Sequence, residues 1–197
     1  GPIPSRHPKM PYEHPEIEVR FLAVDTEKLI ARLRELGAKD LGDDLLEEII
    51  FYDKELHWLA YKRKFIRLRK TKAGTFLTYK HQEFDAADGT EEIEFKIDNA
   101  VKAEVFLERL GFPAYRHQQK KRHTFTLGEV LVDFDTWPRV PTYVELEGPS
   151  EQSLKDAAAE LGLDWGNVVL ENPRAVIEKY YHIPVHTMRW FTFDRFE

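Results

Sequence analysis

The segment Glu16-Ile17-Glu18-Val19-Arg20-Phe21 alternates charged with apolar residues, and Glu92-Ile93-Glu94-Phe95-Lys96-Ile97 is a near copy of it. A period of two is typical of β-strands, in which successive side chains point to opposite faces. Each copy precedes a helical pattern that ends in Leu-Gly, at Leu36-Gly37 and at Leu110-Gly111. The chain therefore carries an internal repeat of a strand followed by a helix.

Further strand patterns occupy residues 46–53, 64–70, 76–82, 115–127, 129–136 and 142–148. Residue types that begin helices stand at Asp25-Thr26, Asp98-Asn99, Ser150 and Asn172-Pro173. About eight strands in two related halves predict an α+β fold, a closed eight-stranded antiparallel β-barrel or tunnel with flanking helices.

The 197 residues are enough for one domain with appendages. We expect residues 1–15, which hold five prolines, to form a disordered leader, and Gly1-Pro2 resembles the remnant of a cleaved tag. Residues 16–185 are predicted to form the tunnel domain. Residues 186–197 are rich in aromatic side chains, so we expect this tail to pack on the domain.

The composition excludes several classes of protein. A net charge of −6 argues against a general nucleic-acid binder, and we expect no sequence-specific nucleic-acid partner. No apolar run reaches the length of a membrane span, so no membrane partner is expected. The absence of cysteine excludes disulfides and thiolate metal sites, and fits a cytoplasmic location. The oligomeric state stays open.

Paired acids recur on the predicted strands, in both repeat copies and again at Glu145-Leu146-Glu147. Two carboxylates on one strand face lie roughly 7 Å apart and repel each other unless a cation lies between them. Oxygen ligands favour Mg²⁺ or Mn²⁺. Any single pair is more simply explained as the solvated face of a strand, and the complete set is what favours a metal site.

Paired cations alternate in the same way. Arg67 and Arg69 stand on either side of Leu68, and Lys120 and Arg122 stand on either side of Lys121. Lys80 lies on a strand predicted between these two pairs. Guanidinium groups suit the oxygens of phosphates. If these faces line the inside of a barrel, the tunnel holds a metal and an anion together, and a phosphate chain with bound metal is a ligand that needs both.

This ordered set resembles the CYTH superfamily, the triphosphate tunnel metalloenzymes. Over residues 16–161 the family's pattern is matched by Glu16, Glu18, Arg67, Arg69, Lys80, Glu92, Glu94, Lys120, Arg122, Asp133, Glu145 and Glu147. Arg20 stands where the family has lysine, and the segment Asp135 to Pro141 differs from the glycine-containing turn of the class IV adenylyl cyclases. Despite these two differences, the layout of the chain resembles that of the class IV adenylyl cyclases.

The resemblance implies a metal-dependent enzyme acting on a small-molecule triphosphate. It assigns Mg²⁺ or Mn²⁺ to Glu16, Glu18, Glu145 and Glu147. It assigns the phosphates to Arg20, Arg67, Arg69, Lys80, Lys120 and Arg122. Catalytic roles fall to Lys80 and to Glu92, Glu94 or Asp133, which would hold a second metal or orient water.

Three functions follow from this pattern. The first is hydrolysis of inorganic or organic triphosphate, and we expect inorganic triphosphate to be split. The second is a class IV cyclase reaction, from ATP to cyclic AMP and pyrophosphate. The third is a non-catalytic module that binds polyphosphate or nucleotide, which the paired acids argue against because an anion binder has no use for them without metal.

Overall fold

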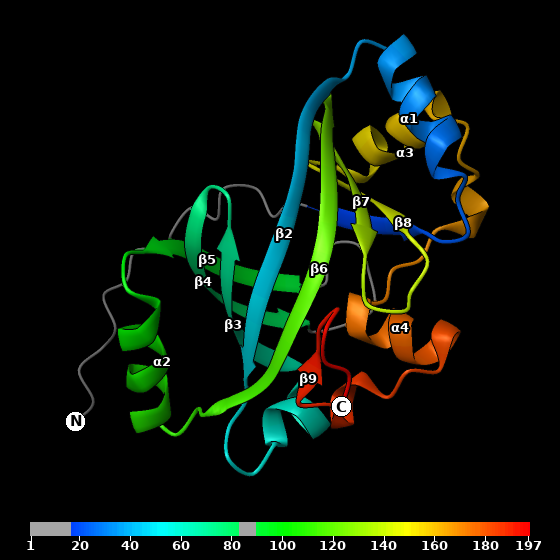
Figure 1. Cartoon of the computed structure of the whole chain (residues 1–197). Helices are drawn as coiled ribbons and strands as arrows, with labels where there is room; N and C mark the ends of the chain where they lie inside the picture. Colours follow the sequence, from blue (N-terminus) through cyan, green and yellow to red (C-terminus); the bar gives the residue numbers. More distant parts are fainter. Residues whose placement is uncertain (1–16, 83–89) are drawn as a thin grey trace, which may run out of the picture.

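The computed structural model describes residues 17–82 and 90–197 (Figure 1). Its strands are β1 (Ile17–Phe21), β2 (Lys39–Phe51), β3 (Lys64–Thr71), β4 (Gly74–Gln82), β5 (Thr90–Ile97), β6 (Ala114–Leu127), β7 (Val130–Thr136), β8 (Tyr143–Gly148) and β9 (Trp190–Phe191). Its helices are α1 (Thr26–Glu35), the π-helix η1 (Trp58–Lys62), α2 (Ala100–Arg109), α3 (Glu151–Glu160), the short η2 (Trp165–Asn167), α4 (Pro173–Tyr181) and the short η3 (Val185–Thr187).

Eight antiparallel strands form one curled sheet in the order β1-β8-β7-β6-β2-β3-β4-β5, and β9 pairs parallel to β6. The long strands β2 and β6 pair along most of their length and join the two halves of the sheet (Figure 1). This arrangement confirms the predicted fold class of eight antiparallel strands with flanking helices.

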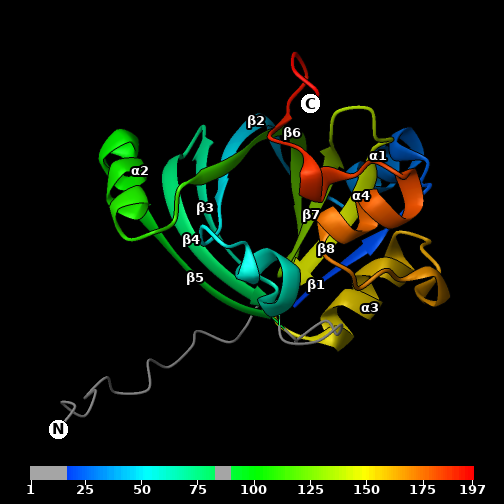
Figure 2. The same ribbon diagram turned by 90° about the horizontal axis from the view of Figure 1, so that it is seen from below.

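The sheet is open rather than closed into a barrel, because β1 and β5 are its two edges within the described ranges (Figure 2). Side chains span the gap instead. Lys80 Nζ on β4 lies 3.2 Å from Glu18 Oε1 on β1 and 3.7 Å from Glu92 Oε2 on β5. Direct pairing of the two edges would set their acidic faces side by side, and like charges opposite each other destabilise a strand pair.

The helix starts predicted from sequence are confirmed by their caps. Asp25 and Asn99 accept hydrogen bonds from backbone N–H groups three residues later, at 3.1 and 2.9 Å, and begin α1 and α2. Ser150 and Asn172 cap α3 and α4 in the same way. The start of β2 was predicted too late, because its first residues are mostly polar and exposed and are held as a strand only by pairing with β6.

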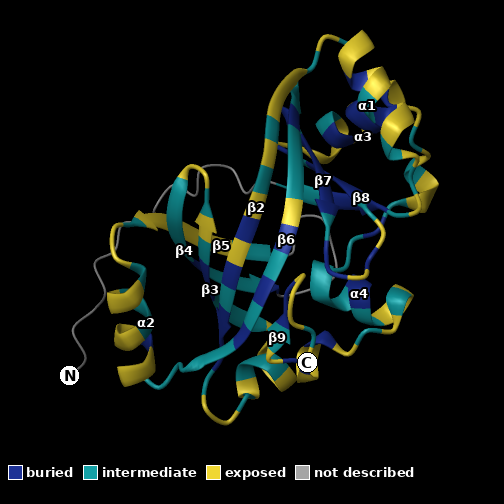
Figure 3. Cartoon of the chain, viewed as in Figure 1, coloured by how far each residue is buried: buried dark blue, intermediate teal, exposed yellow. Residues whose placement is uncertain are grey.

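Helices α1, α2 and α3 cover the outer, convex side of the sheet (Figure 2). On one half, α1 and α3 pack on β1, β7 and β8, and β7 and β8 are mostly buried (Figure 3). Leu33, Val132 and Leu154 are fully buried in this cluster. On the other half, α2 packs Leu107 against Leu68 of β3. Because the apolar side chains of the strands face these helices, the alternation leaves polar side chains on the concave side.

The C-terminal part lies along one end of the concave side. Helix α4 and the residues after it form an apolar cluster with the β7–β8 connection, which includes Tyr143, Ile177 and Phe191. Among the described residues, no helix is long and apolar enough to cross a membrane.

Candidate active site

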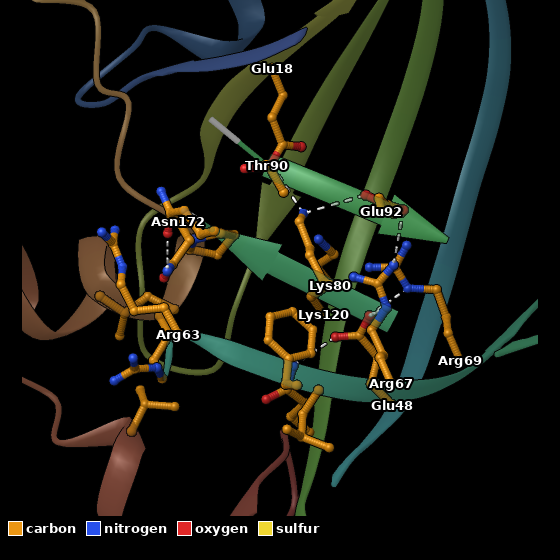
Figure 4. A pocket seen from close by; sticks show the side chains of 18 of the residues that line it. Glu18, Glu48, Arg63, Arg67, Arg69, Lys80, Thr90, Glu92, Lys120 and Asn172 are labelled. Carbon is orange, nitrogen blue, oxygen red and sulfur yellow. Dashed lines mark hydrogen bonds and ion pairs between the residues drawn. The ribbon is translucent and has the colours of Figure 1, made fainter. Parts of the chain in front are cut away.

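The concave face of the sheet lines a cavity of about 360 Å³ (Figure 4). Its wall includes most of the residues predicted from sequence, namely Glu18, Arg20, Arg67, Arg69, Lys80, Glu92, Glu94, Lys120, Arg122, Glu145 and Glu147. Glu16 lies outside the described residues. The strand faces that the charge alternation singled out therefore converge on one space.

Three acids gather on β7 and β8. Carboxylate oxygens of Asp133, Glu145 and Glu147 all lie within 4.8 Å of one another. The cluster arises because Asp133 pairs with Glu145 across β7 and β8, and Glu147 follows two residues along. Asp133 and Glu145 are buried. This grouping of three oxygen ligands is the arrangement that a hard divalent cation such as Mg²⁺ or Mn²⁺ prefers.

The electrostatics of this acid cluster favour a cation. Burial, together with the negative charge of Glu18, raises the pKa of Glu145 to about 7. Burial also raises the pKa of Asp133, where Asp135 adds to the effect. The buried Oε2 of Glu145 accepts no hydrogen bond and lies 3.0 Å from the Nε of Arg20. Three carboxylates so close together repel one another unless a cation lies between them, so the residues present fit a bound divalent metal.

Glu18 faces Glu147 directly across β1 and β8, but its oxygens already contact cations. Arg20 and Lys80 lie 2.9 and 3.2 Å from Glu18 Oε1. Burial opposes the ionisation of Glu18, yet these two cations hold its pKa well below the usual value. Glu18 therefore stands beside the acid cluster, linked by Lys80 to the far edge of the sheet.

Arg20 is fully buried and is held in place by protein groups. Its guanidinium donates to the backbone oxygen of Glu171 at 2.8 Å, and its Nε lies 3.0 Å from Glu145 Oε2. Burial lowers the pKa of Arg20, but the carboxylates of Glu145 and Glu18 raise it by more. The structure thus places this predicted phosphate ligand against the acids rather than in the open part of the cavity.

A first pair of cations comes from β6. Arg122 donates to both oxygens of Asp135, at 2.7 and 2.8 Å, and Lys120 donates to Asp135 at 3.1 Å. Burial, with the positive charge of Arg122, lowers the pKa of Lys120. Arg122 also lies 3.5 Å from Asp133 and 3.7 Å from Glu145. These cations therefore border the acid cluster.

A second pair of cations comes from β3. Arg67 and Arg69 both lie against the buried carboxylate of Glu48, Arg67 at 3.8 Å. Arg67 also lies 3.3 Å from Glu94, and 3.9 Å from Glu92 (Figure 4). Burial and the neighbouring Arg69 lower the pKa of Arg67. Its buried Nε donates no hydrogen bond and is the atom that lies 3.8 Å from Glu48.

Glu92 and Glu94 lie on β5 and belong to this second group of cations. Their side chains are 41% and 38% exposed, so water reaches them. Glu94 accepts a hydrogen bond from the hydroxyl of Thr78 at 2.7 Å. Besides Glu18 and Glu48, the acids of the site thus form a cluster on β7 and β8 and a solvent-facing pair on β5.

Two buried residues that hold the cations were not among the site residues predicted from sequence. Glu48 on β2 and Asp135 on β7 are both buried carboxylates, and each contacts two cations. Arg116 and Gln118 extend the same face of β6. The only available signal was the period-two alternation, which places Asp135 and Gln118 on the faces of Asp133 and Lys120.

Comparison with known proteins now assigns the chain. A family model, the CYTH domain, matches residues 14–170. The chain belongs to the CYTH family. Members of this family act on triphosphates and depend in general on metal ions. The match covers all eight strands of the sheet and thus the whole of the charged cavity wall that they provide.

This CYTH domain is 27% identical over 147 residues to "Putative adenylate cyclase MJ0240" of Methanocaldococcus jannaschii. The aligned region covers 74% of this chain and 83% of that protein. The fold matches the PH1012 protein of Pyrococcus horikoshii, with a TM-score of 0.66, 24% identity, and 80% and 96% of the two chains covered. It also matches "Putative adenylyl cyclase HpAC1" of Hippeastrum, described as having a dominant triphosphatase activity, with a TM-score of 0.59, 17% identity, and 83% and 94% covered.

Proposed function

We propose that this CYTH domain is a metal-dependent triphosphatase that hydrolyses a phosphoanhydride bond on the concave face of its sheet. The observation that carries the proposal is the meeting of opposite charges in one cavity. Three clustered acids adjoin the cations of β6, and the cations of β3 line the same cavity. A triphosphate with a bound divalent metal complements both groups.

Asp133, Glu145 and Glu147 would hold the metal. When bound, Mg²⁺ or Mn²⁺ would neutralise phosphate charge and polarise the bond to be broken. This assignment keeps Glu145 and Glu147 from the metal ligands predicted from sequence, and it adds Asp133 to them. It leaves Glu18 in a positioning role, because Glu18 holds Arg20 and Lys80 beside the acid cluster.

Arg67, Arg69, Lys80, Lys120 and Arg122 would bind the phosphate oxygens. Glu48 holds the two arginines of β3, Asp135 holds the two cations of β6, and both carboxylates are buried. Lys80 is held by Glu18 and Glu92. Fixed charges aimed at the phosphates stabilise the charge that develops as the bond breaks, and they do so without reorganisation.

Glu92 and Glu94 would orient the attacking water. They are the most exposed acids of the cavity, and they lie next to Arg67 and Lys80. A carboxylate placed there accepts a proton from water as its oxygen attacks phosphorus, and the released phosphate leaves through the open side of the sheet.

The cyclase reaction is the second candidate. Two observations favour it: the M. jannaschii relative bears the name of an adenylate cyclase, and the cavity wall includes uncharged side chains such as Ile50, Leu59 and Phe65 besides the acids and cations. In that reaction the ribose 3′-hydroxyl attacks in place of water. The same metal ligands and phosphate-binding cations would serve both reactions.

The test is product identification by chromatography after incubation with inorganic triphosphate and, separately, with ATP, each with Mg²⁺ or Mn²⁺ and again in excess EDTA. We expect phosphate and pyrophosphate from inorganic triphosphate, and no turnover in EDTA. Glu92→Gln should slow the reaction, whereas Glu91→Gln, on the opposite face of β5, should not. Cyclic AMP from ATP with inorganic triphosphate intact would overturn the triphosphatase in favour of the cyclase, and no product from either substrate would overturn both.

A further inference from the structure

A buried chain of hydrogen bonds leads to the arginines of β3. Gln118 of β6 is 8% exposed, and its amide joins two charged side chains. Its Nε2 donates to Glu48 Oε1 at 2.8 Å, and its Oε1 accepts from the Nε of Arg116 at 2.9 Å. A carboxylate only accepts and a guanidinium only donates, so one orientation of the amide satisfies both neighbours. Gln118 is therefore fixed, and it fixes the groups on either side of it.

Glu48 is the buried carboxylate at which this chain meets the arginines of β3. Its Oε1 is occupied by Gln118, and its Oε2 is the atom that contacts Arg69 and lies 3.8 Å from Arg67. Burial opposes the ionisation of Glu48, but Arg69 and Arg67 hold its pKa far below the usual value. Gln118 thus sets which carboxylate oxygen faces the two arginines that we expect to bind phosphate.

Arg116 anchors the other end of the chain. It is 2% exposed, and besides Gln118 it binds Val185 O at 3.1 Å and the Tyr52 hydroxyl at 3.4 Å. All three guanidinium nitrogens are partnered, and none of the three acceptors carries a charge. A buried cation with neutral acceptors adds little stability, because burial costs its hydration. Its place is better explained by the groups that it positions.

The anchor belongs to the C-terminal part of the chain. Val185 begins η3, and the CYTH match ends at residue 170. The segment after Val185 is tied to β6 beside Arg116, because the N–H of His117 donates to Arg189 O at 2.9 Å and β9 pairs with β6 at the same place (Figure 1). The hydrogen bonds therefore connect a segment outside the family match to the charged face of the sheet.

We propose that Gln118 is a positioning residue through which the segment from Val185 to Phe191 sets the places of Arg67 and Arg69. This inference rests on the proposed function, because its effect is on the cations assigned to phosphate. Without the amide, Glu48 Oε1 loses its buried donor, and the carboxylate turns and draws the arginines with it. The charges remain, so triphosphate still binds, but the fixed geometry that stabilises the transition state is lost.

The first experiment measures kcat and KM for inorganic triphosphate with the full chain and Mg²⁺. Gln118→Met keeps the length of the side chain and removes both polar groups, so it should lower kcat between about tenfold and 100-fold and change KM by less than about threefold. Gln119→Met is the matched control. Gln119 lies on the opposite face of β6 and donates to Glu47 of β2 at 3.2 Å, so the same substitution there should leave kcat within about twofold.

Gln118→Glu separates positioning from a merely structural role. Above its pKa the new carboxyl faces Glu48 as a second negative charge, and below it the protonated acid donates to Glu48 as the amide did. Burial and Glu48 raise that pKa, and Arg116, Arg69 and Lys120 oppose the rise. The kcat of Gln118→Glu relative to the wild type should increase at least about threefold from about pH 8 to about pH 6, whereas the ratio for Gln118→Met should stay flat.

A second measurement does not need turnover. Because Gln118 couples the arginines of β3 to Val185, binding of inorganic triphosphate with Mg²⁺ should slow amide hydrogen exchange in residues 185–191 at least about threefold in the wild type. The same addition should leave exchange there unchanged in Gln118→Met. Equal slowing in both proteins, or none in either, would contradict the coupling.

The outcomes separate this inference from the proposed function. Wild-type kinetics in Gln118→Met, an equal loss in Gln119→Met, or a flat pH ratio for Gln118→Glu would each overturn the inference and leave the triphosphatase intact. Failure of the wild type to split inorganic triphosphate would instead overturn the proposed function, and the exchange measurement with bound triphosphate would then decide the inference.

Discussion

Asp135→Asn tests whether one buried carboxylate holds the cations of β6. The Asp135 side chain is 0% exposed, and it accepts from Arg122 at 2.7 and 2.8 Å and from Lys120 at 3.1 Å. Asparagine keeps the shape but removes the negative charge, and it turns one acceptor into a donor that faces two cations. Breaking a buried ion pair by removing one partner costs about 3–5 kcal/mol.

For a chain of this size, that loss corresponds to a fall in melting temperature on the order of 10 °C. The assay is urea unfolding followed by tryptophan fluorescence, since Trp137 packs against Lys120 at 5.0 Å from ring centroid to Nζ. Asp98→Asn, an exposed aspartate before α2, is the matched control and should alter the unfolding free energy by less than about 0.5 kcal/mol. A loss below about 1 kcal/mol in Asp135→Asn would refute the argument, because the cations would then have found other partners or water.

Three further predictions concern the site. Glu18→Gln should cut turnover on the order of 100-fold without unfolding the protein, because Arg20 and Lys80 lose the charge that positions them. A kcat near that of the wild type would show that Glu18 has no role in the reaction. Arg67→Ala and Arg69→Ala should each weaken triphosphate binding in calorimetry by roughly 1.5–3 kcal/mol, the cost of a charge-assisted hydrogen bond, and unchanged affinity in both would move the phosphate site elsewhere. Glu145, with its pKa raised from 4.5 to about 7, keeps a proton in the folded chain that the unfolded chain releases, so the unfolding free energy should fall as pH rises across that window without metal. Glu145→Gln should flatten this dependence in urea titrations, and an unchanged slope would contradict the raised pKa.

The sequence predicted the strands and helix starts well because both depend on local patterns. The period-two alternation predicts strands that have one apolar face. Asp25, Asn99 and Ser150 cap the helices that they were expected to begin. The open edge between β1 and β5 could not be predicted, because closure depends on which strands meet in space and on the charges that then oppose each other.

The candidate site, too, could be predicted from sequence only in part. The residues that line the cavity were recognised as alternating charges, but their grouping depends on strand register, which joins Asp133 to Glu145 rather than to the acids of β5. Glu48 and Arg116 were missed because neither has a like charge two residues away in its strand, so neither belongs to an alternating pair. Their partners come from other strands, so only the folded chain brings them together.

The pairing of β1 with β8 has a consequence for how the protein is made. β1 is the first strand of the described chain, and its partner β8 ends at Gly148, so β1 has no neighbour in the sheet until β8 has left the ribosome. Contacts between such distant segments carry a high loop-closure entropy and form late. Glu18 and Arg20 reach the acids of β8 only through this pairing. A nascent or truncated chain that lacks β8 therefore holds its cations without these acids, and the site is assembled only after β8 has been made.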